Sequence, residues 1–254
     1  MDFLDKFPAM SRGELRDFKK SVDGSFSEFT GEYGEVIEAF FDPLLYFLVW
    51  FEKLLISTPW PIILLIVGAL AWAGSRSIKI ATGAILAFVA IGYFGMWKDT
   101  MSTLAIVSVA TLICISIGIP MGILMARSKV AQALVTPLLD IMQTIPAFVY
   151  LIPVVMLLGI GKVPGLIAVC IYALPPIVRL TNLGIRLVSK EALEAADAFG
   201  ANYRQRLFGV QIPLALPNIF AGINQTIMMA LSMVVIASMI GVAGLGVPVL
   251  RSLS

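Results

Sequence analysis

The sequence predicts an all-α protein that crosses a membrane several times. Of its 254 residues, 59% are hydrophobic and 13% are charged, whereas roughly a quarter of the residues in an ordinary soluble domain are charged. The mean hydropathy is +0.95, and continuous apolar stretches recur from Thr58 onward. Such stretches indicate spanning helices, because a helix satisfies its own backbone hydrogen bonds inside lipid.

The composition also narrows the chemistry. The chain has no histidine, and both cysteines, Cys114 and Cys170, lie in apolar stretches, so we expect neither a zinc site nor a disulfide framework. A net charge of +2 carries no nucleic-acid signature. Because no catalytic triad or paired-carboxylate pattern is present either, we expect the chain not to be an enzyme and to bind no metal or cofactor itself.

Two segments precede the apolar core. Residues 1–36 are rich in charged and small residues and have no signal-peptide pattern, which predicts a water-exposed tail that is at most partly helical. Residues 37–56 are apolar and aromatic, but four charges interrupt them. Each charge would cost roughly 3 kcal/mol at the bilayer centre. We therefore expect an amphipathic helix in the membrane interface, with a spanning helix as the alternative. The interrupting charges are Glu38, Asp42, Glu52 and Lys53.

Six later stretches are long enough, or nearly so, to cross about 30 Å of hydrocarbon. Prolines break the region 133–183, so a short linking helix is expected before the fourth span. Gly241 and Gly246 bound a segment that ends the sixth span. The predicted spans cover residues 58–74, 78–96, 103–125, 145–160, 164–182 and 217–240.

The basic residues predict an orientation. If the spans alternate, eight basic residues share one side and three share the other, and the richer side is expected to be cytoplasmic. The loop 186–213 is then cytoplasmic and the N-terminal tail is periplasmic. The eight are Arg76, Lys79, Arg127, Lys129, Arg186, Lys190, Arg204 and Arg206, and the three are Lys98, Lys162 and Arg251.

The loop 186–213 holds the most informative pattern. Residues 190–199 are strong helix formers, and Gly200 is a natural helix stop because it accepts a left-handed conformation. Glu191 and Glu194 share one face of this helix. A second helical segment, 202–210, leads back to the membrane. This pattern predicts a helix-turn-helix that a soluble partner can push, and the alternative is an ordinary amphipathic surface helix that ends in glycine.

The spacing inside this loop adds a family resemblance. Glu194-Ala195-Ala196 is followed after three residues by Gly200, and nine residues later by Val210-Gln211-Ile212-Pro213. This arrangement resembles the EAA loop of bacterial ABC import permeases. The resemblance implies that the loop couples the permease to an ATPase through Glu191, Glu194, Ala195, Ala196, Gly200 and Pro213.

The resemblance extends across residues 58–254. The segments 137–153, 159–165, 173–181 and 224–240 are similar to the permease subunits of ProU-type (OpuA-type) importers for quaternary amines. This implies a type I ABC importer (MetI-like) transmembrane domain. Members of that family usually continue into a further span, so a final span is expected to be absent from a chain that stops at Ser254.

The resemblance also implies partners and a task. Two copies of the permease would sit on two cytoplasmic ATPase subunits, which hold ATP and Mg²⁺, and an external binding protein would deliver the substrate. The chain would import glycine betaine or a related methylated osmolyte into a bacterial cell by alternating access, as osmoprotection. The residues do not distinguish glycine betaine from proline betaine, choline, trimethylamine oxide or a sulfonium analogue.

The substrate passage is predicted from polar and aromatic residues near the spans. A quaternary ammonium favours aromatic faces, and polar residues within spans usually face the protein interior or a cavity. Each of the chosen residues could instead make an ordinary helix–helix contact. Asp140 is expected to form an ion pair, with Arg127 or Lys129, or to lie at the cytoplasmic edge of the membrane. The candidates for the passage are Gln143, Thr144, Phe148, Tyr150, Asn224, Gln225, Met228 and Ser232.

Two other classes of function stay open at this stage. A secondary transporter or channel for small solutes would need no ATPase, but inverted repeats or membrane-embedded charges would be expected of it. A membrane scaffold would account for the apolar stretches but not for the Glu-Ala-Ala loop. Co-purification with an ATP-hydrolysing subunit would separate both classes from an ABC permease.

Overall fold

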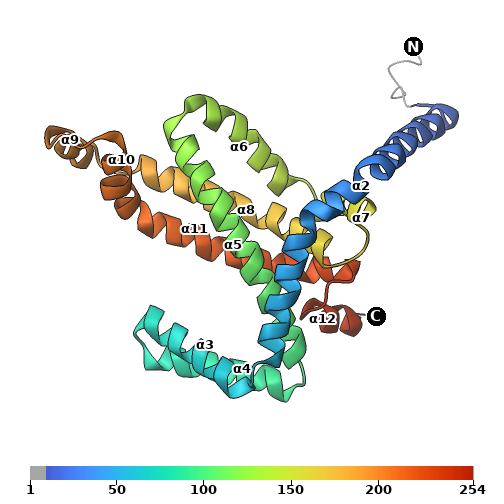
Figure 1. Ribbon diagram of the computed structural model, residues 1–254, viewed down its shortest axis with the longest axis horizontal. Helices are drawn as coiled ribbons and strands as arrows, with labels where there is room; N and C mark the ends of the chain where they lie inside the picture. Colours follow the sequence, from blue (N-terminus) through green and yellow to red (C-terminus); the bar gives the residue numbers. More distant parts are fainter. Residues whose placement is uncertain (1–9, 254) are drawn as a thin grey trace, which may run out of the picture.

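The computed structural model describes residues 10–253, and within them nearly every residue is helical and no strand occurs (Figure 1). The first nine residues of the predicted tail lie outside the described part. The helices are α2 (Arg12–Ser57), α3 (Trp60–Ser75), α4 (Ile78–Tyr93), α5 (Trp97–Arg127), α6 (Lys129–Thr144), α7 (Ala147–Leu158), α8 (Lys162–Arg186), α9 (Lys190–Ala198), α10 (Tyr203–Arg206), α11 (Ile212–Ala237) and α12 (Gly246–Leu253).

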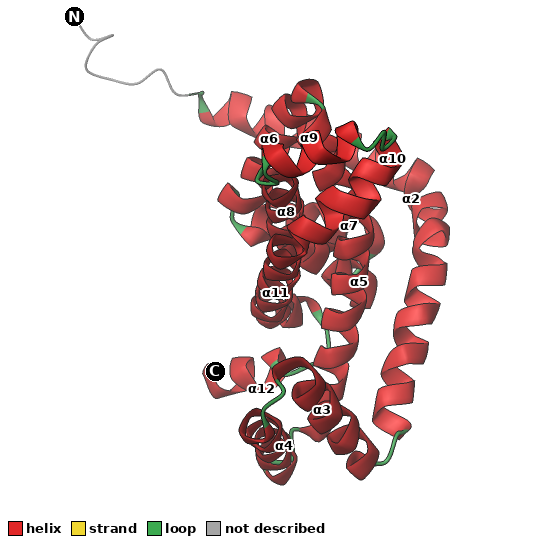
Figure 2. Cartoon of the chain, turned by 90° about the vertical axis from the view of Figure 1, so that its left-hand side faces the viewer, coloured by secondary structure: helices red, strands yellow, loops and turns green. Residues whose placement is uncertain are grey.

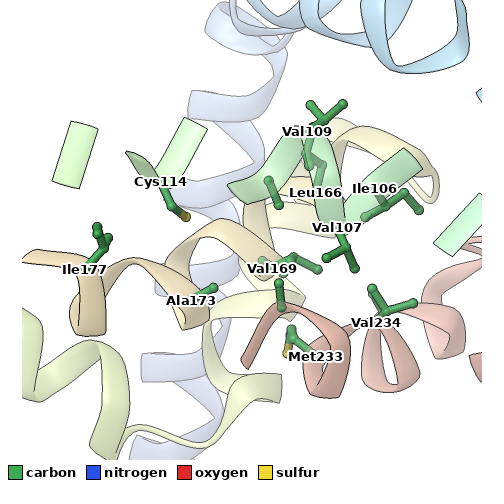
Figure 3. Close-up of a cluster of buried hydrophobic side chains, with 14 of the residues drawn as sticks. Ile106, Val107, Val109, Cys114, Leu166, Val169, Ala173, Ile177, Met233 and Val234 are labelled. Atoms are coloured by element: carbon green, nitrogen blue, oxygen red, sulfur yellow. The ribbon is translucent and has the colours of Figure 1, made fainter. Parts of the chain in front are cut away.

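Three long helices, α5, α8 and α11, form the centre of the molecule. α8 packs along both α5 and α11, and their buried aliphatic side chains meet in one cluster. Figure 3 shows Ile106 and Val109 from α5 beside Val169 from α8, with Met233 and Val234 of α11 on the other side. In Figure 2, α6, α9 and α10 lie at the end of the molecule opposite to α3 and α4.

Glycines allow these three helices to approach closely. A Cβ placed on Gly122 of α5 would lie 2.7 Å from the Val178 carbonyl oxygen of α8. A Cβ on Gly184 of α8 would lie 3.2 Å from the Ala215 carbonyl oxygen of α11. Since lipid offers no hydrophobic drive for helices to associate, close backbone packing through small residues supplies much of the attraction between spanning helices.

Several helices are shorter than the spans that were predicted for the same stretches. Within residues 10–253, α5, α8 and the continuous segment Tyr203–Ile240 are each long and apolar enough to cross a membrane. The stretches 58–74 and 78–96 contain α3 and α4, which have 16 residues each. Each of these helices is therefore about 24 Å long, at 1.5 Å per residue. The stretch 145–160 became α7, which has 12 residues and is bent by 94° from α6. These three helices are each too short to span alone.

The first half of α2 corrects the prediction of a tail that is at most partly helical, because the described residues of that tail are helical from Arg12 on. Ser11 starts the helix with a capping box, in which its Oγ accepts the Glu14 N–H at 3.3 Å while the Glu14 carboxylate accepts the Ser11 N–H at 2.8 Å. This backbone hydrogen bond from Ser11 lowers the pKa of Glu14. The signal was present in the sequence as a Ser-x-x-Glu pattern.

The second half of α2, which was expected to lie in the interface, packs against α5. Leu48 is fully buried there, and Glu52 is only 8% exposed. Ser102 Oγ donates a hydrogen bond to Glu52 at 2.8 Å, and Lys162 forms an ion pair with it. One of the charges that argued for contact with water is therefore satisfied inside the protein. α2 then meets α3 at a bend of 105°.

Candidate functional site

α9 is shaped by local hydrogen bonds at both of its ends. Ser189 caps its start, where the Oγ accepts the Ala192 N–H at 3.3 Å. At its end the Gly200 N–H donates to the Asp197 carbonyl at 2.9 Å, and the Ala201 N–H donates to the Ala196 carbonyl at 3.0 Å. This pattern is a Schellman motif, and Gly200 adopts the left-handed φ of 74° that the motif requires. The predicted helix stop at Gly200 is therefore seen in the structure.

The return segment begins directly after this turn. Asn202 and Gln205 form a reciprocal capping box over 3.0 and 2.8 Å, which starts α10. A π-helical turn, Leu207–Gln211, then joins α10 to α11 without a loop. Pro213 cannot donate a backbone hydrogen bond and its ring crowds the preceding turn, so widening of the helix just before it has a physical cause. The predicted segment 202–210 is thus helical and continuous with α11.

A few side chains attach this unit to the rest of the molecule. Arg206 pairs with Asp197 at 3.0 Å, which ties α10 to α9. The Arg127 guanidinium lies 3.9 Å from the centre of the Tyr203 ring, a cation–π contact between the end of α5 and α10. Leu207 is the buried anchor of the π-helical turn. No residue of α9 itself is buried.

The end of α8, from which α9 continues, is held by Arg186. Its guanidinium donates to the Met125 carbonyl of α5 at 2.9 Å and to the Gln132 side chain of α6 at 2.7 Å. It also donates to Asn182 at 2.9 Å. A displacement of α9 would consequently be transmitted through Arg186 to α5, α6 and α8 together.

The residues predicted to couple the loop to a partner lie on an accessible surface. Glu191, Glu194, Ala195, Gly200 and Pro213 are exposed. Ala196 is half-buried, and its carbonyl accepts the Ala201 N–H in the turn that follows α9. Small and acidic side chains thus form a surface that another protein can contact closely.

One feature of this surface was not predicted from the sequence. Phe199, directly before Gly200, is 93% exposed. A large aromatic ring in an otherwise charged and small-residue loop is a signal that could have identified it, since exposed aromatic residues are frequent anchors of protein–protein interfaces.

Half of the predicted passage residues lie on one open face of α11. Asn224, Gln225, Met228 and Ser232 are exposed, whereas the opposite face, which includes Thr226 and Ala230, is buried against the bundle. Ser232 Oγ donates to the Met228 carbonyl at 3.0 Å, and Asn224 Nδ2 lies 3.9 Å from the Met228 sulfur. The polar groups of this face therefore bond only locally, within their own helix.

The other half lie around the bend between α6 and α7. Gln143, Thr144 and Phe148 are exposed, and Thr144 Oγ1 donates to the Asp140 carbonyl at 2.9 Å. Tyr150 packs against the main core, and its buried hydroxyl has no hydrogen-bond partner within the described residues. The eight candidates thus form two groups on separate elements.

The expected partner of Asp140 is corrected by the structure. Asp140 forms its ion pair with Arg179 of α8, and neither Arg127 nor Lys129 is that partner. Asp140 lies in the last turns of α6, whereas Lys129 is the first residue of the same helix, so the two are far apart along it. Arg127 instead stacks on Tyr203.

A second charged site lies near the start of α5. Lys98, Lys162 and Arg251, the three basic residues that the alternating spans place on one side, all line one cavity of about 490 Å³. Glu52 lines it as well, paired with Lys162. These residues, which are distant in the sequence, therefore share one end of the bundle.

Comparison with known proteins gives a family for this architecture. Residues 118–254 match the family of binding-protein-dependent transport system inner membrane components. The match includes α8, α9, α10 and α11, and so the whole helix-turn-helix described above.

Several curated relatives are similar over most of the chain. The glycine betaine/proline betaine transport system permease protein ProW of Escherichia coli is 52% identical over 211 residues, which are 83% of this chain and 59% of that protein. The glycine betaine/carnitine transport permease protein GbuB of Listeria monocytogenes is 44% identical, over 92% of this chain and 80% of its own length. The glycine betaine transport system permease protein OpuAB of Bacillus subtilis is 40% identical, over 96% and 84%. The chain thus spans little more than half the length of ProW.

Proposed function

Because the chain belongs to the family of binding-protein-dependent transport system inner membrane components, we propose that it is the membrane-spanning permease subunit of an ATP-driven importer for glycine betaine or a related methylated osmolyte. The names of ProW, GbuB and OpuAB, which are all described as glycine betaine transport permeases, support this substrate class. Their shared description as transport permeases does not favour a secondary transporter or channel.

The single observation that carries the proposal is the rigid, exposed unit of α9 and α10. It is closed by caps and an ion pair, and it interrupts the chain between α8 and α11. These two helices pack more extensively on each other than any other pair in the described part of the chain. A push on the unit therefore acts directly on the core of the bundle, which is what a coupling element must do.

The partners follow from this assignment. Two copies of the chain would bind two cytoplasmic ATPase subunits through α9, with Glu191, Glu194 and the small surface of Ala195 and Ala196 in contact. The ATPase subunits hold ATP and Mg²⁺, and this chain supplies no catalytic group. An external binding protein delivers the osmolyte on the opposite side of the bacterial inner membrane.

In the transport cycle, the α9–α10 unit transmits the motion of the ATPase subunits to α8 and α11. ATP closes the ATPase dimer, the two α9–α10 units move together, and α8 and α11 open the passage toward the loaded binding protein. Hydrolysis of ATP then returns the bundle to its inward-open state. Passage residues on α11 and on the α6–α7 bend bind the osmolyte weakly enough to release it.

The proposed orientation places the α9–α10 unit in the cytoplasm. A periplasmic N-terminal tail is not proposed, because α2 runs antiparallel to α5 and therefore begins at the α6 and α9 end of the molecule (Figure 2). Six basic residues near this unit support the proposed orientation, namely Arg127, Lys129, Arg186, Lys190, Arg204 and Arg206. Arg76 and Lys79, which the alternating spans place with them, lie at the α3–α4 hairpin at the opposite end (Figure 2). The cavity shared by Lys98, Lys162 and Arg251 supports the same sidedness, because the three residues meet at one end of the bundle.

The test is ATP-dependent uptake of radiolabelled glycine betaine into liposomes that hold this chain, its ATPase and its binding protein. Gly200→Pro is expected to abolish uptake, since it removes the N–H that donates to Asp197 and the residue that accepts a positive φ. Glu194→Lys is expected to impair uptake by reversing a charge on the contact surface. The matched control is Gly83→Ala on α4, where an added Cβ meets nothing within 4 Å.

Two results would contradict the proposal. Uptake that survives both loop substitutions would remove the coupling role of α9. Uptake that continues without ATP or without the ATPase would point to a secondary transporter instead.

A further inference from the structure

Arg179 is a charged residue in the interior of a spanning helix. The other two basic residues of α8, Lys162 and Arg186, are its first and last residues. Arg179 lies seven residues before Arg186, about 10 Å further along the helix. Ionisable residues at such depth are costly and usually mark a binding or transport site.

The partner of Arg179 comes from another element. Asp140 of α6 forms an ion pair with it, and the two side chains are 53% and 41% exposed, respectively. The charges neutralise each other, yet both side chains remain partly exposed. The Nε–H of Arg179 is buried and has no hydrogen-bond acceptor within the described residues. The guanidinium thus has donor capacity that its present partner does not use.

Polar and aromatic residues lie on the same helix faces as this pair. On α6, Gln143 and Thr144 follow Asp140 at three and four residues, so they share its face. On α8, Tyr172 precedes Arg179 by seven residues, which is two helical turns and again the same face. The pair therefore lies within the region that contains one group of the proposed passage residues.

We propose that Arg179 and Asp140 form a transient binding site for a zwitterionic substrate in the passage of the permease. The Arg179 guanidinium receives the substrate carboxylate, because its planar donors match a carboxylate in a two-bond geometry. The Asp140 carboxylate receives the quaternary ammonium, which has no N–H to donate and is attracted by charge alone. This inference rests on the proposed function and adds a site that accounts for the substrate class.

The exchange of partners explains why such a site can bind weakly and reversibly. Without substrate each residue neutralises the other, so neither charge is left unpaired at membrane depth. A zwitterion replaces this one pair by two, and the net charge of the site stays the same. A cation that lacks a carboxylate would leave Arg179 unpaired, so the site favours zwitterions.

The test measures glycine betaine uptake and ATP hydrolysis in the same proteoliposomes, with the ATPase and the loaded binding protein present. Arg179→Gln is expected to lower uptake at least tenfold while ATP hydrolysis stays stimulated by the loaded binding protein. The ratio of substrate moved to ATP hydrolysed therefore falls, which separates a defect in the passage from a defect in coupling. Lys79→Gln, which removes an exposed positive charge from the start of α4, is the control for loss of charge.

A double variant distinguishes binding from a structural role. Asp140→Asn combined with Arg179→Gln keeps a hydrogen-bonding pair of similar size but removes both charges, and uptake is expected to stay low. Recovery of uptake in the double variant would overturn the proposal, since a structural link between α6 and α8 would then be sufficient. A change from dimer to monomer in the Arg179→Gln variant would also overturn it, by placing the pair in an interface between two copies.

The outcomes separate this inference from the proposed function. If the unmodified chain takes up no glycine betaine, the proposed function fails and the inference fails with it. If the unmodified chain takes up glycine betaine and Arg179→Gln leaves the ratio of uptake to ATP unchanged, the inference alone is overturned.

Discussion

The α9–α10 unit and the core of α5, α8 and α11 are held together by different physics. The unit has no buried residue in α9, and its form comes from caps, a glycine turn and one ion pair. The core depends on long-range packing, in which glycines of one helix contact the backbone or side chains of another. The α9–α10 unit can therefore keep its form through local hydrogen bonds without being buried in the core. We expect it to move as one body against α5, α8 and α11, whose close packing tolerates few substitutions.

The first prediction tests the core and has the largest expected effect. Gly122→Val would drive a side chain into the Val178 carbonyl oxygen and the Thr181 side chain, which a Cβ would approach to 2.7 and 2.6 Å. Overpacking of this kind costs about 1 to 3 kcal/mol or more, and here backbone must shift. We expect a large fall in the thermal unfolding temperature in detergent, with Gly83→Ala unaffected. Equal stability of the two variants would mean that α5 and α8 are not closely packed.

The second prediction concerns the buried charge that joins α2 to the core. Glu52→Ala leaves Lys162 without its partner and removes the acceptor of Ser102. Because Lys162 is 29% exposed and can be hydrated, we expect a loss of about 2 to 3 kcal/mol, below that for a fully buried pair. Thermal unfolding measures it, with the exposed neighbour Lys53→Ala as the control. A neutral Glu52→Ala would show that this end of α2 is not part of the core.

The third prediction concerns the α9–α10 unit, where we expect a substitution to change binding and not stability. Phe199→Ala removes an aromatic ring that is 93% exposed. We expect no change in unfolding temperature but about a tenfold weaker affinity for the ATPase subunit, as for an interface anchor worth about 1.4 kcal/mol. The control is Tyr93→Ala, an exposed aromatic residue at the end of α4. A loss of stability would mean that the ring supports α9 itself.

The fourth prediction has the smallest effect and concerns the ion pair within the unit. Asp197 and Arg206 are both partly exposed, so a double-mutant cycle with alanine should give a coupling energy below about 1 kcal/mol. Hydrogen exchange of the segment 190–206 reports it, with faster exchange in both single variants. A much larger coupling energy would show that this pair, and not the Schellman turn, sets the form of the unit.

Much of the structure of the α9–α10 unit could be predicted because it is local. A capping serine, a run of helix formers and a glycine stop lie within a dozen residues, and the same residues close the Schellman motif. The membrane character was predictable for a similar reason, since the hydropathy of each stretch is its own property. The sharp bends between α2 and α3 and between α6 and α7 were not predicted, because such bends depend on how those helices pack.

Which segments form apolar helices, where α9 ends, and which family the loop resembles can all be read from the local sequence. The pairing of Asp140 with Arg179, 39 residues away, and the burial of Glu52 beside Lys162, 110 residues away, depend on how the helices pack in three dimensions. The ion-pair partner and the burial of a residue depend on its surroundings, and those surroundings are supplied by helices that are distant in the sequence. The helical periodicity of α6 or of α2 predicts which face is buried but does not predict which helix packs against that face.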